Sequence, residues 1–251
     1  MEFHRIKAAG VELEGGWIYQ PTCAVQEDGS IKIDPGAEAP NGDQINYVGE
    51  APSPPCGSPD ELFSWMDSFY PDLADASCGM HVHISFKSPY TYLRAMDKAF
   101  HIYIREGLRE WGKREGVMDN RFWDRLAGEN RFCNNVYAPM RQVRGKGKSG
   151  SRYTFLNYCY ERYGTIELRV FPQFHTYGEA VRAIKAYFSL VEEWMSYPPV
   201  NLKRRRIVEI MPKADRKPQN PETQQLYLGA TSDREEKQML IVPEYAQNEA
   251  I

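Results

Sequence analysis

The sequence has few cysteines, no long apolar run and no large excess of charge of either sign. Its five cysteines are an odd number, and no two of them form a Cys-x-x-Cys pair. With no apolar stretch at the amino end, this argues against the disulfide framework of a secreted protein. No stretch approaches the roughly 20 apolar residues of a membrane helix. We therefore expect reduced thiols, a cytoplasmic location and no membrane partner.

The charge balance also argues against a nucleic-acid partner. The formal net charge is -3, from 31 Lys and Arg against 34 Asp and Glu. Such a chain has no general attraction for a polyanion. The basic run "KRRR" at 203–206 is followed by Glu209 and Asp215, so we interpret it as a solvated surface segment. A function must be sought in local motifs.

Periodicity and turn signals predict strands first and then helices between later strands. Expected strands are 5–14, 17–25, 30–33, 45–51, 78–86, 151–160 and 164–171, and expected helices are 58–70, 88–111, 119–128 and 181–195. The Asp-Gly pair at 28–29 favours a hairpin turn. This order indicates an α+β fold with an antiparallel sheet. We expect a catalytic domain over 1–200 and a partly irregular extension over 201–251.

The stretch "CGMHVHISF" at 78–86 places two histidines inside an otherwise apolar strand. Because side chains alternate along a strand, His81 and His83 share one face. The same spacing pairs Glu12 with Glu14 in "GVELEG". Three strands, each with a pair of polar groups, would build one polar face if they share a sheet.

The third pair is Glu167 and Arg169 in "TIELRVF", and Glu50 stands near the end of another strand. Two carboxylates about 4 Å apart repel by roughly 4 kcal/mol at an effective dielectric of about 20, so several together favour a bound cation. Carboxylates with an imidazole suit Mg²⁺ or Mn²⁺, which commonly hold substrate phosphates. Arg169 would suit a phosphate or carboxylate through its planar guanidinium.

Five motifs in order, "GVELEG", "GEAPSPP", "CGMHVHIS", "RYTFLN" and "GTIELRVF", resemble the amidoligases of the glutamine synthetase and glutamate-cysteine ligase superfamily. The resemblance spans residues 10 to 195. It implies a glutamine synthetase-like catalytic domain with a curved antiparallel sheet and helices packed on one side. It also implies ATP-dependent joining of a carboxylate, of an amino acid or peptide, to an amine through an acyl phosphate.

The resemblance assigns one metal ion to Glu12, His83 and Glu167, with His81 as the alternative to His83. It assigns a second metal ion to Glu14 and Glu50. The implied cofactors are ATP and Mg²⁺ or Mn²⁺, and a monomer or homodimer is expected.

The resemblance also implies roles for the basic and amide side chains. Arg169 would stabilise the phosphoryl group in transit, Arg152 would bind a phosphate or carboxylate, and Asn157 is a further site candidate. Asp28 and Asp43 compete with Glu50 for the second metal, and Asp28 is also a candidate general base. The basic segment 141–152 lacks the glycine of a phosphate-binding loop, because Gln142 stands in its place.

Two other functions stay open at this point. Cys78, His81 and His83 lie close in sequence, and Cys56 would complete the tetrahedral ligand set of a zinc hydrolase. A non-catalytic binding protein on the same fold is the other alternative. Tightly held zinc without nucleotide binding would favour the hydrolase.

Overall fold

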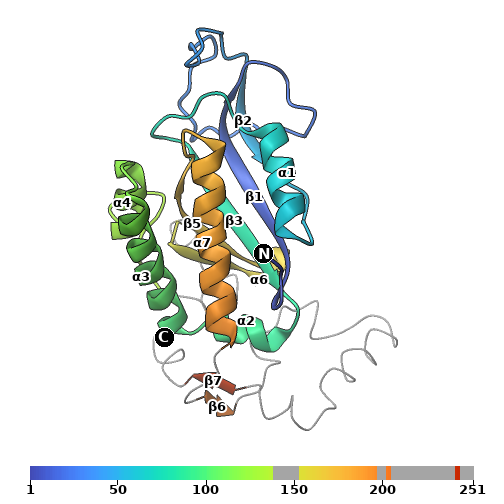
Figure 1. The fold of residues 1–251 in the computed structure, drawn as a ribbon, viewed down its shortest axis with the longest axis vertical. Helices are drawn as coiled ribbons and strands as arrows, with labels where there is room; N and C mark the ends of the chain where they lie inside the picture. Colours follow the sequence, from blue (N-terminus) through green and yellow to red (C-terminus); the bar gives the residue numbers. More distant parts are fainter. Residues whose placement is uncertain (138–152, 197–201, 205–240, 244–251) are drawn as a thin grey trace, which may run out of the picture.

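The structure is a computed structural model that describes residues 1–137, 153–196, 202–204 and 241–243. Its main feature is a five-stranded antiparallel sheet with the strand order β2-β1-β3-β5-β4. In that order the strands are Tyr47–Pro52, Ile6–Trp17, Gly79–Phe86, Thr165–Pro172 and Leu156–Cys159. Helices cover one side of the sheet (Figure 1). The expected α+β class with an antiparallel sheet is therefore confirmed.

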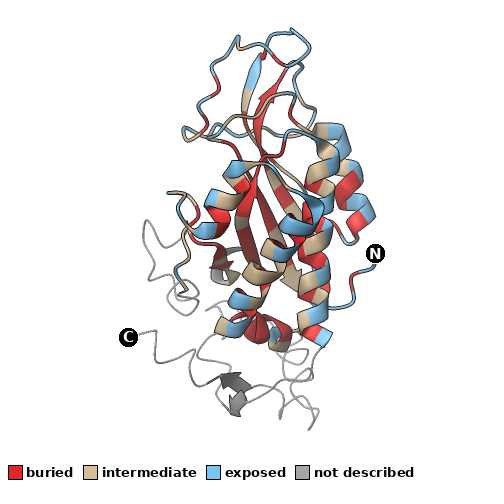
Figure 2. Ribbon diagram, turned by 60° about the vertical axis from the view of Figure 1, so that its left-hand side comes forward, coloured by how far each residue is buried: buried red, intermediate tan, exposed pale blue. Residues whose placement is uncertain are grey.

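The helices are α1 (Pro59–Phe69), α2 (Pro89–Ala95), α3 (Lys98–Glu115), α4 (Asn120–Ala127), α6 (Tyr160–Tyr163) and α7 (Tyr177–Ser196). Buried side chains from one face of the sheet pack with the apolar faces of these helices in one core. Leu13, Val82 and Leu168 belong to this core, each between two polar residues of its own strand. The alternation therefore turns the polar pairs to the opposite face. Figure 2 shows how completely the central strands are buried.

Helix starts follow the side-chain caps that the sequence predicts. Ser58 accepts a hydrogen bond from the backbone N–H of Glu61, and Pro59 occupies the first turn of α1. Asp119 caps α4 in the same way, and Gly128, with φ of 82°, ends it. These two elements confirm the predicted boundaries.

The prediction of one helix over 88–111 is wrong, because the chain forms α2 and α3 with a break at Met96. Met96 donates to the carbonyls of the last turn of α2, and Asp97 adopts an extended conformation. The Asp97 carboxylate then accepts a hydrogen bond from the backbone N–H of Ala99, and a new helix starts there. A capping aspartate inside the apolar repeat thus outweighs the continuous periodicity.

The predicted strands 17–25 and 30–33 are also not formed. The first strand continues to Trp17, and residues 18–46 form a long connection with its own small core of Ile31, Ile33, Ala39, Ile45 and Cys78. The turn at 28–31 exists, with the Ile31 N–H donating to the Asp28 carbonyl, but it joins no strands. Apolar residues that alternate here are buried against one another instead of pairing in a sheet.

The elements over residues 156–196 agree with the prediction in their order. β4 and β5 pair antiparallel across α6, and Gly164 takes φ of 68° at the turn. β4 is shorter than the predicted strand 151–160, and α7 contains the predicted helix 181–195. Most of 201–251 lies outside the described residues, apart from β6 (Leu202–Arg204) paired with β7 (Ile241–Pro243). None of the described helices is long and apolar enough to cross a membrane.

Candidate metal centre

The register of the sheet brings the predicted polar pairs together. Glu12 lies opposite His81, and Glu14 lies opposite Glu50. His83 lies opposite Glu167 on the next strand. Because β1, β3 and β5 are adjacent and antiparallel, one short stretch of each strand contributes to a single polar face.

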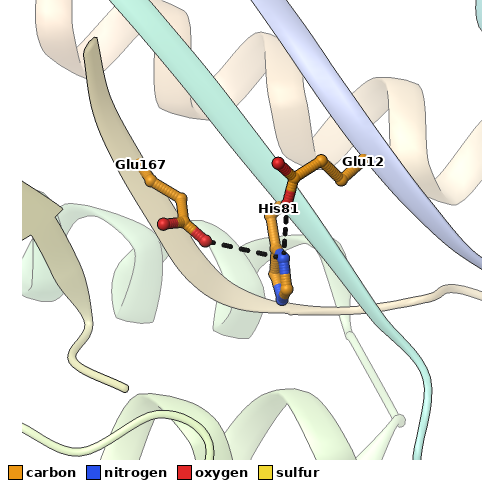
Figure 3. Close-up of side chains that lie close together, drawn as sticks. All are labelled: Glu12, His81 and Glu167. Carbon is orange, nitrogen blue, oxygen red and sulfur yellow. Dashed lines mark hydrogen bonds and ion pairs between the residues drawn. The ribbon is translucent and has the colours of Figure 1, made fainter. Parts of the chain in front are cut away.

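The first group of ligand atoms is centred on His81 (Figure 3). His81 Nδ1 lies 3.0 Å from Glu12 Oε2 and 3.5 Å from Glu167 Oε1. One atom from each of the three residues fits within 4.8 Å of the others. The His81 and Glu167 side chains are only 4% and 5% exposed, whereas Glu12 is 26% exposed, so the group can be reached from the Glu12 side.

His83 lies next to this group. Its Nε2 is 3.0 Å from Glu12 Oε1, and its Nδ1 is 3.1 Å from the Thr165 hydroxyl. Of the two histidines that sequence left open, the structure therefore places His81 in the converging group. His83 contacts the other oxygen of Glu12 and can orient that carboxylate.

A second group consists of Glu14, Asp28 and Glu50, whose carboxylate oxygens also lie within 4.8 Å of one another. Asp28 comes from the 18–46 connection, which is fastened to β2 by two backbone hydrogen bonds of 2.8 and 2.9 Å between Gln26 and Glu50. Asp43 instead contacts Asn41 in an exposed turn. Of the competing acids, Asp28 and Glu50 converge.

Charges explain the pKa values of the first group. Burial alone would raise the pKa of Glu12, but hydrogen bonds from His81 and His83 hold it well below its ordinary value. Glu167 is fully buried, yet its pKa is lowered by Arg169 and then by the two histidines. Both carboxylates are therefore ionised and ready to bind a cation.

Glu50 shows the opposite behaviour. Burial, followed by repulsion from Glu12, Glu14 and Asp28, raises the pKa of Glu50 to about 7. The described side chains thus supply too little positive charge to balance the carboxylates of this second group. A divalent cation is what such an oxygen-rich set of ligands would accept.

Arg169 lies beside the first group. Its guanidinium is paired with Glu167 and lies with its Cζ 5.6 Å from the centre of the Tyr153 ring. Asn157 donates to the other oxygen of Glu167 at 2.6 Å, so it orients that carboxylate. The Cys159 thiol donates to the same oxygen at 3.5 Å. Arg152 and the basic segment 141–152 lie outside the described residues.

The zinc hydrolase set is not brought together in the described chain. The Cys78 thiol donates to Asp75 and belongs to the small core of the 18–46 connection. Cys56 belongs to the main core. Neither converging group in the described residues contains a cysteine. The ligand chemistry is that of carboxylate oxygens with one imidazole, which is typical of Mg²⁺ and Mn²⁺.

Several contacts of the site have no signal in the sequence. Gly79 donates its backbone N–H to Glu14 Oε2 at 2.5 Å. Cys159 and Thr165 reach the site from the two sides of one turn, since Cys159 ends β4 and Thr165 begins β5. A glycine amide or a threonine hydroxyl is too common in sequence to indicate a site, and only the strand register shows what each one contacts.

Comparisons of the chain with models of known families, with curated proteins and with solved structures found no match. Its function must therefore be inferred from the geometry and chemistry of these two groups.

Metal affinity is expected to rise steeply with pH because of Glu50. In the ion-free protein Glu50 holds its proton up to a pKa of about 7, whereas a metal needs the carboxylate. Mn²⁺ binding should therefore strengthen by at least about 10-fold from about pH 6 to 8 and release a proton at the lower pH. Isothermal titration in buffers of different ionisation enthalpy measures both effects.

The matched variant for this test is Glu50→Gln, which removes the titrating group and keeps its size. Its Mn²⁺ affinity should be weaker and should depend less on pH over this range. A variant that keeps the full pH dependence would show that another group is responsible.

Proposed function

We propose that this protein is an ATP-dependent carboxylate-amine ligase with a glutamine synthetase-like catalytic domain. The observation that supports it most is the convergence of two groups of candidate cation ligands from four adjacent strands and the 18–46 connection, with Arg169 beside the first group. The order of the five motifs that resemble the amidoligases agrees with this arrangement. Each motif described in full contributes a residue to the polar face or its rim.

The residues present fit two divalent cations. Glu12, His81 and Glu167 would hold one, and Glu14, Asp28 and Glu50 would hold the other. When bound, Mg²⁺ or Mn²⁺ would hold the phosphate oxygens of ATP and neutralise their charge. The low pKa of Glu12 and Glu167 supports this reading, since both are already deprotonated at neutral pH.

The side chains of the protein would position and stabilise the reacting groups. A carboxylate is a poor electrophile, so ATP would first phosphorylate it, and an amine would then displace phosphate from the acyl phosphate. Arg169, held by Glu167 and covered by Tyr153, would direct its free donors to the phosphoryl oxygens. Asn157 would keep Glu167 oriented. Asp28, a candidate general base from sequence, would serve the second cation instead.

The proposed substrates are the carboxylate of an amino acid or peptide and an amine, and the proposed assembly is a monomer or homodimer. A binding protein that has lost catalysis would have little need for two converging groups of partly buried ligands. We therefore prefer the ligase, with the binding protein as the outcome if no turnover is found.

Trapping of the acyl phosphate tests this reaction class without knowledge of the amine. Hydroxylamine replaces the amine in an incubation with ATP, Mg²⁺ and a panel of amino-acid and peptide carboxylates, and the hydroxamate is measured by its iron(III) colour. We expect a hydroxamate that requires both ATP and Mg²⁺ with at least one carboxylate. ATP binding without any hydroxamate would favour a binding protein, and zinc binding without ATP binding would favour the hydrolase.

A further inference from the structure

We propose that Arg125 of α4 is a positioning residue for the polar face of the sheet. Its guanidinium fixes the backbone at the start of β3 and at a bulge in β5. Through this backbone it sets the positions of Glu14 and Arg169. The role of Arg125 at a metal site rests on the proposed function. The contact itself, between Arg125 and two strands, is a property of the structure.

The bulge lies opposite His81. On β3, Met80 pairs with Phe171 and Val82 pairs with Leu168. One residue thus separates the paired positions on β3, while two residues, 169 and 170, separate them on β5. A β-bulge turns the side chains of the longer strand in a new direction and often lies beside a functional site. The direction of Arg169 is therefore set by this irregularity.

Arg125 contacts the bulge and the neighbouring strand at once. Its Nη1 donates to the Arg169 carbonyl at 3.4 Å, and its Nη2 donates to the Cys78 carbonyl at 3.3 Å. Arg125 is 2% exposed, and α4 packs against β5. A planar guanidinium can span two carbonyls on different strands, which a single ammonium group cannot do in the same geometry.

The neighbouring Gly79 shows how closely this guanidinium approaches the site. A Cβ atom at Gly79 would lie 3.0 Å from Arg125 Nη1 and 3.1 Å from His81 Nε2. The N–H of Gly79 donates to Glu14, a member of the second ligand group. A shift of the Arg125 guanidinium would therefore move the amide that holds Glu14.

The charge of Arg125 is unusual for so buried a group. In the described part of the chain it forms no ion pair, and its Nε has no hydrogen-bond partner. A buried cation without a paired carboxylate is costly. Burial lowers the pKa of Arg125, Cys133 and then Glu14 raise it, and Arg169 lowers it further. The guanidinium thus also adds positive charge beneath the polar face of the sheet.

Arg94 offers a matched control within the same chain. It is also buried, at 9% exposed, and its guanidinium donates to the carbonyls of Trp194 and Met195 at 2.8 and 2.9 Å. Those carbonyls belong to the end of α7 and not to the ligand strands. Arg94→Lys therefore measures the cost of removing a buried bridging guanidinium away from the site.

The experiment compares Arg125→Lys with Arg94→Lys in three measurements: thermal unfolding, the amide NMR resonance of Gly79 in ion-free protein, and Mn²⁺ binding by calorimetry. Both variants are expected to melt at a lower temperature. Arg125→Lys alone should move the Gly79 resonance and weaken Mn²⁺ binding by about 10- to 100-fold. Arg94→Lys should leave both unchanged.

A wild-type Gly79 resonance and wild-type Mn²⁺ affinity in Arg125→Lys would overturn the proposal, as would equal losses in Arg94→Lys. If Arg125→Lys does not fold, Mg²⁺ is titrated into the wild-type protein. The Arg125 Nε resonance should then shift while that of Arg94 stays fixed, and an unmoved Arg125 resonance would refute the coupling. Wild-type protein that binds no metal would defeat the proposed function, and the ion-free Gly79 measurement would still decide the role of Arg125.

Discussion

Glu12→Gln is expected to weaken Mn²⁺ binding at the first ligand group by more than about 100-fold. This loss is larger than the one caused by removing a residue that only orients a metal ligand. Glu12 contributes an oxygen to the converging group and contacts both histidines at 3.0 Å. Glutamine keeps the size of the side chain and removes the charge that attracts the cation. Calorimetric titration with Mn²⁺ measures the loss.

Glu192→Gln is the control for this prediction. The Glu192 carboxylate also accepts hydrogen bonds from backbone N–H groups, exposed ones from His4 and Arg5 and a partly buried one from Ile6, but it lies on α7. Its loss should lower the melting temperature and leave Mn²⁺ affinity unchanged. Equal Mn²⁺ affinity in Glu12→Gln and wild type would remove Glu12 from the metal centre.

Arg169→Lys is expected to lower the rate of hydroxamate formation by roughly 10³-fold, with a much smaller change in Mn²⁺ affinity. Arginines that stabilise a transferring phosphoryl group contribute about 10³ to 10⁵ to the rate. Lysine keeps the positive charge beside Glu167, but it cannot pair with a carboxylate and a phosphate oxygen through one planar group. The measurement is the rate of ATP-dependent hydroxamate formation at saturating ATP and Mg²⁺.

The Arg105→Lys variant serves as the surface control, because Arg105 pairs with Glu106 on α3. It should retain the wild-type rate. Unchanged turnover in Arg169→Lys would show that this arginine only neutralises Glu167. A parallel loss of Mn²⁺ affinity would instead point to a role in holding the metal ligand.

The polar face could be predicted from sequence because it follows from one local rule. Alternation places Glu12 with Glu14 and Glu167 with Arg169 on one face of their strands, whatever the rest of the fold does. Antiparallel pairing of these strands with the histidine strand then makes the two ligand groups possible. The structure confirms this pairing, while metal binding by the groups is still a prediction.

The choice of ligands could not be predicted, because it depends on register and on loops. His81 and His83 are equivalent by alternation, and only the pairing of β3 with its neighbours separates them. Asp28 and Asp43 both lie in a polar connection, and the contact of Gln26 with Glu50 brings the first of them to the sheet. Local patterns contain no information on such distant contacts.

Arg125 was missed for a different reason. In "DNRFWDRLAG" it stands among the charged residues of an amphipathic helix, where an arginine is usually solvated. Its burial follows from the packing of α4 against β5 beside the bulge. Neither the bulge nor that packing leaves a periodic signal in the sequence.

The proposed function requires that acids from separate strands and from the 18–46 connection bind divalent cations on one face of the sheet. Anomalous diffraction from crystals grown with Mn²⁺ and a non-hydrolysable ATP analogue tests it most directly. We predict two manganese peaks, one among Glu12, His81 and Glu167 and one among Glu14, Asp28 and Glu50, with the analogue's phosphates against both. Crystals that show the protein without manganese at these carboxylates, or with the metal bound elsewhere, would contradict the claim.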